Sequence, residues 1–137
     1  MNQSNESLYS VPNRLRRMEN MHVVFWLLKD ISWCMIWKPL GITMIAPTLL
    51  IAIWISWKNR QITSELSHNL AIVFWITANA YWMISEFLGF DEMPVWREFT
   101  GKHIALIPFV TGAMILLYYY AVQLPREMKQ HKSVTLQ

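Results

Sequence analysis

The chain has 137 residues, of which 54% are hydrophobic and only 15% are charged, with a formal net charge of +3. About a quarter of a typical soluble domain is charged, so this composition argues against helices that keep one polar face for water. The basic residues are scattered and form no nucleic-acid-binding motif, so we expect lipid and not nucleic acid around this chain.

The charges divide the chain into polar ends and apolar segments. Residues 1–20 form a polar, basic N-terminal segment that we expect to stay attached as a signal anchor. Residues 21–124 follow as the predicted membrane domain, and 125–137 as a polar C-terminal tail. Within the domain, four apolar runs of about 16 to 21 residues approach the length needed to cross a bilayer, and they lack period-2 alternation. The predicted fold is an all-α integral membrane protein whose four transmembrane helices cover 21–37, 41–57, 69–88 and 103–123. A soluble bundle with deeply buried helices is the alternative.

The first predicted helix carries an adjacent lysine and aspartate, Lys29 and Asp30, in an otherwise apolar run. A tight turn, Lys38 to Gly41, follows and makes the first two helices an antiparallel hairpin. A cytoplasmic link, 58–69, leads to the third helix, for which Ser67 is a candidate cap. In the longest link, 89–103, Pro94 is expected to begin a short interfacial helix.

Lysine and arginine residues predict the orientation of the four helices. With the N-terminus in the cytoplasm, three basic residues lie on the outer side: Lys38, Arg97 and Lys102. Eight lie on the cytoplasmic side: Arg14, Arg16, Arg17, Lys58, Arg60, Arg126, Lys129 and Lys132. This bias predicts a protein of the bacterial inner membrane with both termini in the cytoplasm.

The first and third predicted helices are similar in sequence. FWLLKDISWCMI, from Phe25, aligns with FWITANAYWMIS, from Phe74, at an offset of 49 residues. The second and fourth helices each contain a proline, Pro47 and Pro108, which we interpret as helix-kink candidates. The pattern predicts a duplicated two-helix hairpin in a parallel repeat. Chance similarity between two tryptophan-rich apolar helices is the alternative.

Helical spacing places polar residues and tryptophans of this repeat on common stripes. One stripe contains Trp26, Asp30, Trp33 and Trp37, at spacings of 4, 3 and 4 residues. The equivalent stripe, with the same spacings, contains Trp75, Asn79, Trp82 and Glu86. Polar groups at membrane depth should face protein, so we expect Lys29, Asp30, Asn79 and Glu86 to form a polar intramembrane cluster. Trp26, Trp33, Trp75 and Trp82 are expected to form its aromatic wall.

Two interpretations of this cluster remain open. Lys29 and Asp30 could neutralise each other while Asp30 bonds to Asn79 and holds two helices together. Alternatively, Asp30, Asn79 and Glu86 could line a path for a proton, an ion or a small polar solute. Glu86 also suits an ordinary solvated helix end.

The sequence shows no signature of a cofactor or of an enzyme. A haem between His22 and His68 is conceivable, but neither histidine belongs to a spaced ligand set, and we expect no metal and no cofactor. Phosphate loops, nucleophile elbows and zinc-protease helices are absent from the sequence. A redox or lipid-modifying membrane enzyme is therefore the weakest hypothesis.

The leading functional hypothesis is a non-enzymatic accessory, assembly or scaffold component of a membrane complex. Its partners would be lipid together with a second copy or another membrane protein. The alternative is a small oligomeric transporter or channel with a polar site at Asp30 and Asn79, in the middle of the membrane.

Overall fold

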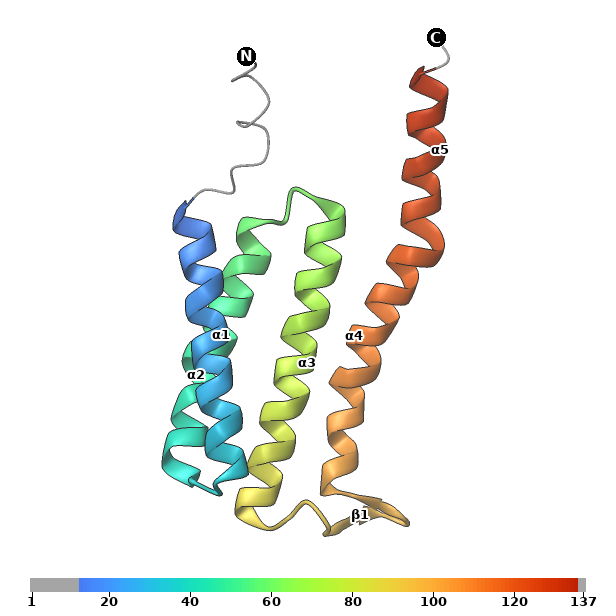
Figure 1. The fold of residues 1–137 in the computed structure, drawn as a ribbon. Coiled ribbons are helices and arrows are strands. Elements are labelled where there is room, and N and C mark those ends of the chain that lie inside the picture. The colour runs from blue at the N-terminus through green and yellow to red at the C-terminus, as the bar shows by residue number, and fades with distance from the viewer. Residues whose placement is uncertain (1–12, 136–137) are drawn as a thin grey trace. The chain divides into compact units, whose positions relative to one another are not determined.

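The computed structural model describes residues 13–135, with side chains described over 16–130. Residues 1–12 of the expected N-terminal segment and 136–137 of the tail lie outside the described residues. The helices are α1 (Asn13–Cys34), α2 (Lys38–Lys58), α3 (Thr63–Leu88), the 3-10 helix η1 (Gly101–Ala105), α4 (Leu106–Tyr118), the π-helical η2 (Tyr119–Gln123) and α5 (Leu124–Thr135) (Figure 1). Two short strands, β1 (Pro94–Trp96) and β2 (Phe99–Thr100), precede η1. The chain divides into two compact units, Met1–Ile51 and Ala52–Gln137.

Three helical stretches of the described chain are long and apolar enough to cross a membrane. They are Lys38–Lys58, Thr63–Leu88 and the continuous stretch Gly101–Gln130. Many of their large apolar side chains are exposed, including Leu50, Trp57 and Ile107. Surfaces of this kind suit lipid, because the bilayer core offers no water to solvate a polar face. The structure thus supports a helical membrane protein, as the composition predicts.

Helix α1 differs from the other long helices in polarity. It begins at Asn13, before the predicted start at residue 21, and so includes Arg16, Arg17 and Glu19 as well as Lys29 and Asp30. Polar residues with good helix propensity extend an apolar helix beyond its membrane segment. Because of these charged residues, α1 is too polar to be one of the three apolar stretches.

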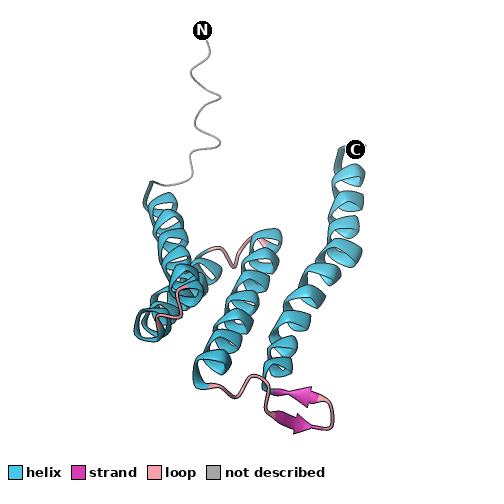
Figure 2. Ribbon diagram, turned by 60° about the horizontal axis from the view of Figure 1, so that its bottom comes forward, coloured by secondary structure: helices cyan, strands magenta, loops and turns pink. Residues whose placement is uncertain are grey.

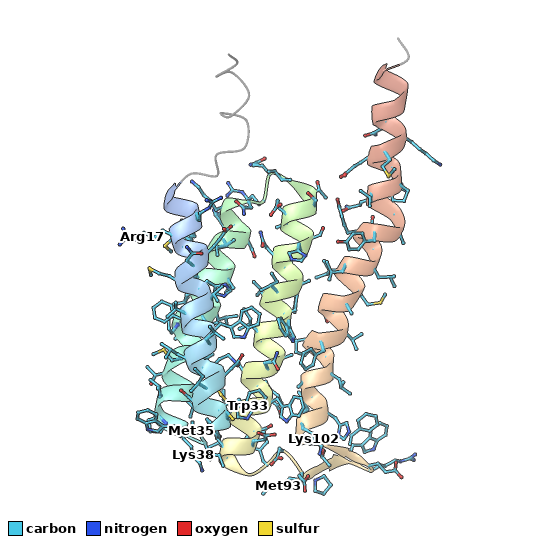
Figure 3. All side chains as sticks on the ribbon, viewed as in Figure 1. Arg17, Trp33, Met35, Lys38, Met93 and Lys102 are labelled. Carbon is cyan, nitrogen blue, oxygen red and sulfur yellow. The ribbon has the colours of Figure 1, made fainter. Side chains whose placement is uncertain are left out.

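The turn between α1 and α2 lies earlier than predicted. The amide of Trp37 donates to the carbonyl oxygen of Ser32 (2.8 Å), and the amide of Ile36 donates to that of Trp33 (3.0 Å). These two bonds form a Schellman motif, which ends α1 at Cys34. The Lys38–Gly41 segment expected to form the turn is instead the first turn of α2, where Pro39 is tolerated because first-turn amides have no helical partner. Figure 3 shows Met35 and Lys38 at the end where α1 leads into α2.

Ile36 occupies the left-handed position of this motif with φ 54°. That conformation brings Cβ of an L-residue close to the following carbonyl oxygen, and it usually selects glycine. Because Ile36 is 70% exposed, truncation sacrifices little packing. We therefore expect Ile36→Gly to raise the free energy of unfolding in detergent by about 1 kcal/mol, measured by reversible SDS unfolding.

Met35→Gly is the matched control, since Met35 lies in the same turn and is also exposed. Among the described residues other than glycine, only Ile36 and Arg97 have a positive φ. Glycine at position 35 should lower stability by about 0.5 to 1 kcal/mol through added freedom of the unfolded chain. If both variants had an equally lowered free energy of unfolding, the backbone strain at Ile36 would be contradicted.

Helices α3 and α4 of the second unit lie side by side and antiparallel (Figures 1 and 2). They are in close contact at Gly112, where an added Cβ would lie 3.2 Å from the backbone oxygen of Ala71 and 3.3 Å from Cβ of Phe74. Small residues at such contacts allow two backbones to approach in a membrane. Helix α3 begins at Thr63, six residues before the predicted 69, with Glu65 in its first turn. A carboxylate at that end of a helix is favourable.

The link between α3 and α4 contains a hairpin where a short helix was expected. Strands β1 and β2 pair antiparallel, with Trp96 opposite Phe99 (Figure 2). Pro94 begins β1 and does not begin a helix. Proline is compatible with the first residue of a short edge strand as well as with a first helical turn, so the proline alone could not decide between them.

The proline expected to kink the fourth helix does not lie in its middle. Pro108 stands in the first turn of α4, directly after η1, where its missing amide is tolerated. Pro47 does lie inside α2, as expected. The larger irregularity of the last helix is η2, which precedes Pro125. The amide of Leu124 there bonds five residues back, to the carbonyl oxygen of Tyr119, and a widened turn relieves the clash that a proline ring makes with the carbonyl four residues earlier.

Candidate functional site: the Lys29 face of α1

Most hydroxyl groups of the apolar helices are satisfied by their own backbone. Each donates to the carbonyl oxygen one turn earlier, a bond that needs no second helix. The hydroxyls of Ser32, Thr48, Ser56, Thr77 and Thr111 all bond in this way, at 2.6 to 3.0 Å. The charged pair in α1 is a different kind of polar feature, because its two side chains bond to each other.

One side of α1 gathers an alternating series of polar and aromatic side chains, which we call the Lys29 face: His22, Trp26, Lys29 and Trp33. Their spacings of 4, 3 and 4 residues place them on a single helical stripe. The rings of His22 and Trp26 have centroids 5.9 Å apart, and His22 lies against the backbone of Thr48 in α2. His22 and Lys29 are buried, and the two tryptophans are partly buried.

The ion pair of Lys29 and Asp30 lies at the centre of this face. Nζ of Lys29 donates to Oδ1 of Asp30, and it lies 5.8 Å from the centroid of the Trp33 ring. The side chain of Lys29 is 0% exposed, whereas that of Asp30 is 45% exposed. The ammonium is thus enclosed, with a carboxylate and an aromatic face as its neighbours, while part of the carboxylate remains at the surface of the chain.

On α3, the members of the predicted second stripe lie toward the surface of the chain. Trp75, Trp82 and Glu86 are exposed, and Asn79 is partly exposed. The side-chain amide of Asn79 donates to the carbonyl oxygen of Trp75, 3.1 Å away, on its own helix. Glu86 lies in the last turn of α3, a position that fits an ordinary helix end.

Asp30 and Asn79 belong to different compact units, so their pairing remains a prediction. The duplication also remains a prediction, although the two helix ends share a feature. The amide of Phe90 donates to the carbonyl oxygen of Ser85 (3.0 Å), as Trp37 does to Ser32. These matching Schellman motifs are 53 residues apart, one helical turn more than the sequence offset of 49.

The sequence predicted Lys29 as a member of the polar cluster, but the predicted stripe contained Asp30 in its place and did not include His22. The signal was present, because residues 22, 26, 29 and 33 keep the same 4-3-4 spacing as the predicted stripe. Among the described residues, no group of three or more His, Cys, Asp or Glu side chains is arranged to hold a metal ion.

Comparisons with known proteins found no match: no protein-family model, no curated protein and no solved structure matches this chain. The fold and its apolar surface define the class, a small helical membrane protein.

Proposed function

We propose that this protein is a non-enzymatic accessory, assembly or scaffold component of a membrane complex. The observation that carries the proposal is the Lys29–Asp30 pair, whose carboxylate is 45% exposed on a helix with apolar neighbours. A carboxylate facing hydrocarbon is costly. A partner helix that offers a hydrogen-bond donor would cover it, and such polar contacts join membrane helices.

This proposal makes α1 a fourth membrane-spanning helix, in addition to the three apolar stretches. Its 22 residues correspond to about 33 Å at 1.5 Å per residue. The apolar part, residues 21–34, covers about 21 Å of a hydrocarbon core of about 30 Å, so the charged first turns would reach to the headgroups. The bias in lysine and arginine supports two cytoplasmic termini and a bacterial inner membrane. The partner is a second copy of this chain or another membrane protein.

The test uses the full-length protein, purified in mild detergent from its native membrane, and two variants at the pair. Asp30→Asn keeps an oxygen acceptor, so the partner should remain bound. In Lys29→Met/Asp30→Leu both charges are absent, and this variant should fold but elute without the partner. Size-exclusion chromatography with light scattering gives the mass of each species, and circular dichroism reports the fold. A wild-type protein that elutes as a bare monomer would overturn the proposal.

The second candidate is a small oligomeric transporter or channel, and the complete burial of Lys29 favours it. Buried ionisable groups in membrane segments often mark routes for protons or ions. Reconstituted vesicles separate the two candidates, because Asp30→Asn should abolish proton-coupled flux while leaving scaffold assembly intact. Proton flux in wild-type vesicles that disappears in Asp30→Asn would favour the transporter.

A further inference from the structure

A cavity of about 240 Å³ lies between the end of α3 and the start of α4 in the second unit. Its wall combines aromatic and aliphatic side chains with two basic ones. The lining residues are Trp82, Lys102, His103, Ala105, Leu106 and Phe109. None of these six is acidic. Figure 3 shows Lys102 beside the hairpin, at the end of the molecule where α3 leads into α4.

The loop before α4 holds the two basic residues of this cavity in place. The amide of Gly101 donates to the carbonyl oxygen of Met93 (3.0 Å), and the amide of Lys102 donates to that of Asp91 (2.9 Å). An added Cβ on Gly101 would lie 2.2 Å from the carbonyl oxygen of Phe90, so only glycine fits this close approach. The cavity wall is therefore pre-organised and needs little ordering when a ligand binds.

A hydrogen bond within this loop determines what the imidazole of His103 can offer. The backbone amide of Thr100 donates to Nδ1 of His103 (2.9 Å) as part of a capping box. Nδ1 is then an acceptor, so the proton of the neutral ring lies on Nε2. His103, which lines the cavity together with Lys102, thus carries an N–H donor at Nε2.

The ammonium of Lys102 is available to a ligand. Its present partner is Oε1 of Glu92, at 3.4 Å, and the two side chains are 40% and 80% exposed. An exposed ion pair of this kind contributes little stability. An anionic ligand can therefore displace Glu92 readily.

We propose that this cavity binds the anionic headgroup of a phospholipid. Two donors meet the phosphate, while Trp82, Leu106 and Phe109 contact the first carbons of the lipid. The volume is below the roughly 300–1,000 Å³ of pockets for drug-sized ligands, so it suits a headgroup and leaves the acyl chains along the helices. A tryptophan at such a site is typical of the membrane interface.

Binding of short-chain lipids to the detergent-purified, full-length protein tests this proposal. The probes are dihexanoyl phosphatidylglycerol, dihexanoyl phosphatidylcholine and inorganic phosphate, each titrated by isothermal calorimetry, with the two lipids kept below their micellar concentrations. We expect phosphatidylglycerol to bind, and Lys102→Gln and His103→Gln each to weaken its binding about 10- to 100-fold through loss of a hydrogen bond involving a charged group. Both lining positions are partly exposed, so these variants should fold.

Two control variants keep the interpretation specific. Lys58→Gln removes an exposed lysine at the end of α2, and His68→Gln changes a histidine that lines another cavity of this unit, together with Glu65. Neither should alter binding of phosphatidylglycerol. Equal binding of phosphatidylcholine, or unchanged binding in Lys102→Gln, would overturn the anionic site. Inorganic phosphate that binds as tightly as the lipid would overturn the assignment to a lipid headgroup.

Discussion

Asp30→Leu should lower the free energy of unfolding by about 3 kcal/mol, the lower end of the range for breaking a buried ion pair. The substitution leaves the fully buried ammonium of Lys29 without its anion. Trp33 would remain as a neighbour of the charge at 5.8 Å, but an aromatic face is worth only about 0.5 to 2 kcal/mol to a cation. The lower end applies because Asp30 is partly exposed. Reversible SDS unfolding followed by circular dichroism provides the measurement.

The double variant Lys29→Met/Asp30→Leu should recover most of this loss. Replacing both members of a buried pair with apolar residues of similar volume is often neutral or stabilising. We expect it to unfold within about 1 kcal/mol of the wild type, which implies a coupling of at least about 2 kcal/mol between the two positions when Lys29→Met is measured as the second single variant. As a control, Lys102→Met/Glu92→Leu removes an exposed pair and should show a coupling below about 1 kcal/mol. An Asp30→Leu protein as stable as the wild type would show that Asp30 does not neutralise Lys29.

Gly112→Leu should separate α3 from α4 and lower the free energy of unfolding by about 3 kcal/mol, the upper end of the usual range for overpacking. Even a single added carbon would lie 3.2 Å from the backbone oxygen of Ala71 and 3.3 Å from Cβ of Phe74. A backbone atom cannot turn aside as the end of a side chain can. Gly112→Ala should therefore already lower stability, by about 1 kcal/mol.

Ala113→Leu is the matched control, because Ala113 is the next residue of α4 and is exposed. Leucine at position 113 should change stability by less than about 0.5 kcal/mol, as is usual for surface substitutions. A disulfide between cysteines introduced into α3 and α4 at this contact would report their separation directly. Similar stabilities for Gly112→Leu and Ala113→Leu would show that the two helices do not meet at Gly112.

The apolar helices could be predicted because their signal is compositional. The interval 42–57 contains no charge, and α2 covers it entirely. The helix ends were harder to predict, because polar residues continue a helix beyond its apolar part. Arg16 and Arg17 belong to α1 for this reason, and the residues from Thr63 to His68 belong to α3.

The turn after α1 could not be predicted from local preferences. A left-handed residue is normally sought at a glycine or an asparagine, and here it is the β-branched Ile36. The nearest glycine, Gly41, lies inside α2 and is buried. Its presence, together with Pro39, drew the predicted turn to the wrong segment.

The stripe on α1 shows why spacing alone could not identify the buried charge. Lys29 lies three residues after Trp26 and four before Trp33, whereas Asp30 lies four after and three before. Both residues satisfy the i+3 and i+4 rule equally. Only the three-dimensional structure shows that Lys29 is enclosed and that Asp30 keeps contact with the surface.

The π-helical segment η2 has a consequence for every residue that follows it. A π-bulge is equivalent to one residue inserted into a regular helix, and one residue corresponds to a rotation of about 100°. The rotational position of α5 is therefore shifted relative to α4. If the residues were counted as one regular α-helix, the expected directions of Arg126 and Lys129 around the helix axis would be wrong by more than a quarter turn. Deleting one residue between Tyr119 and Gln123 would restore the count and swing this basic tail to a different side of the helix axis.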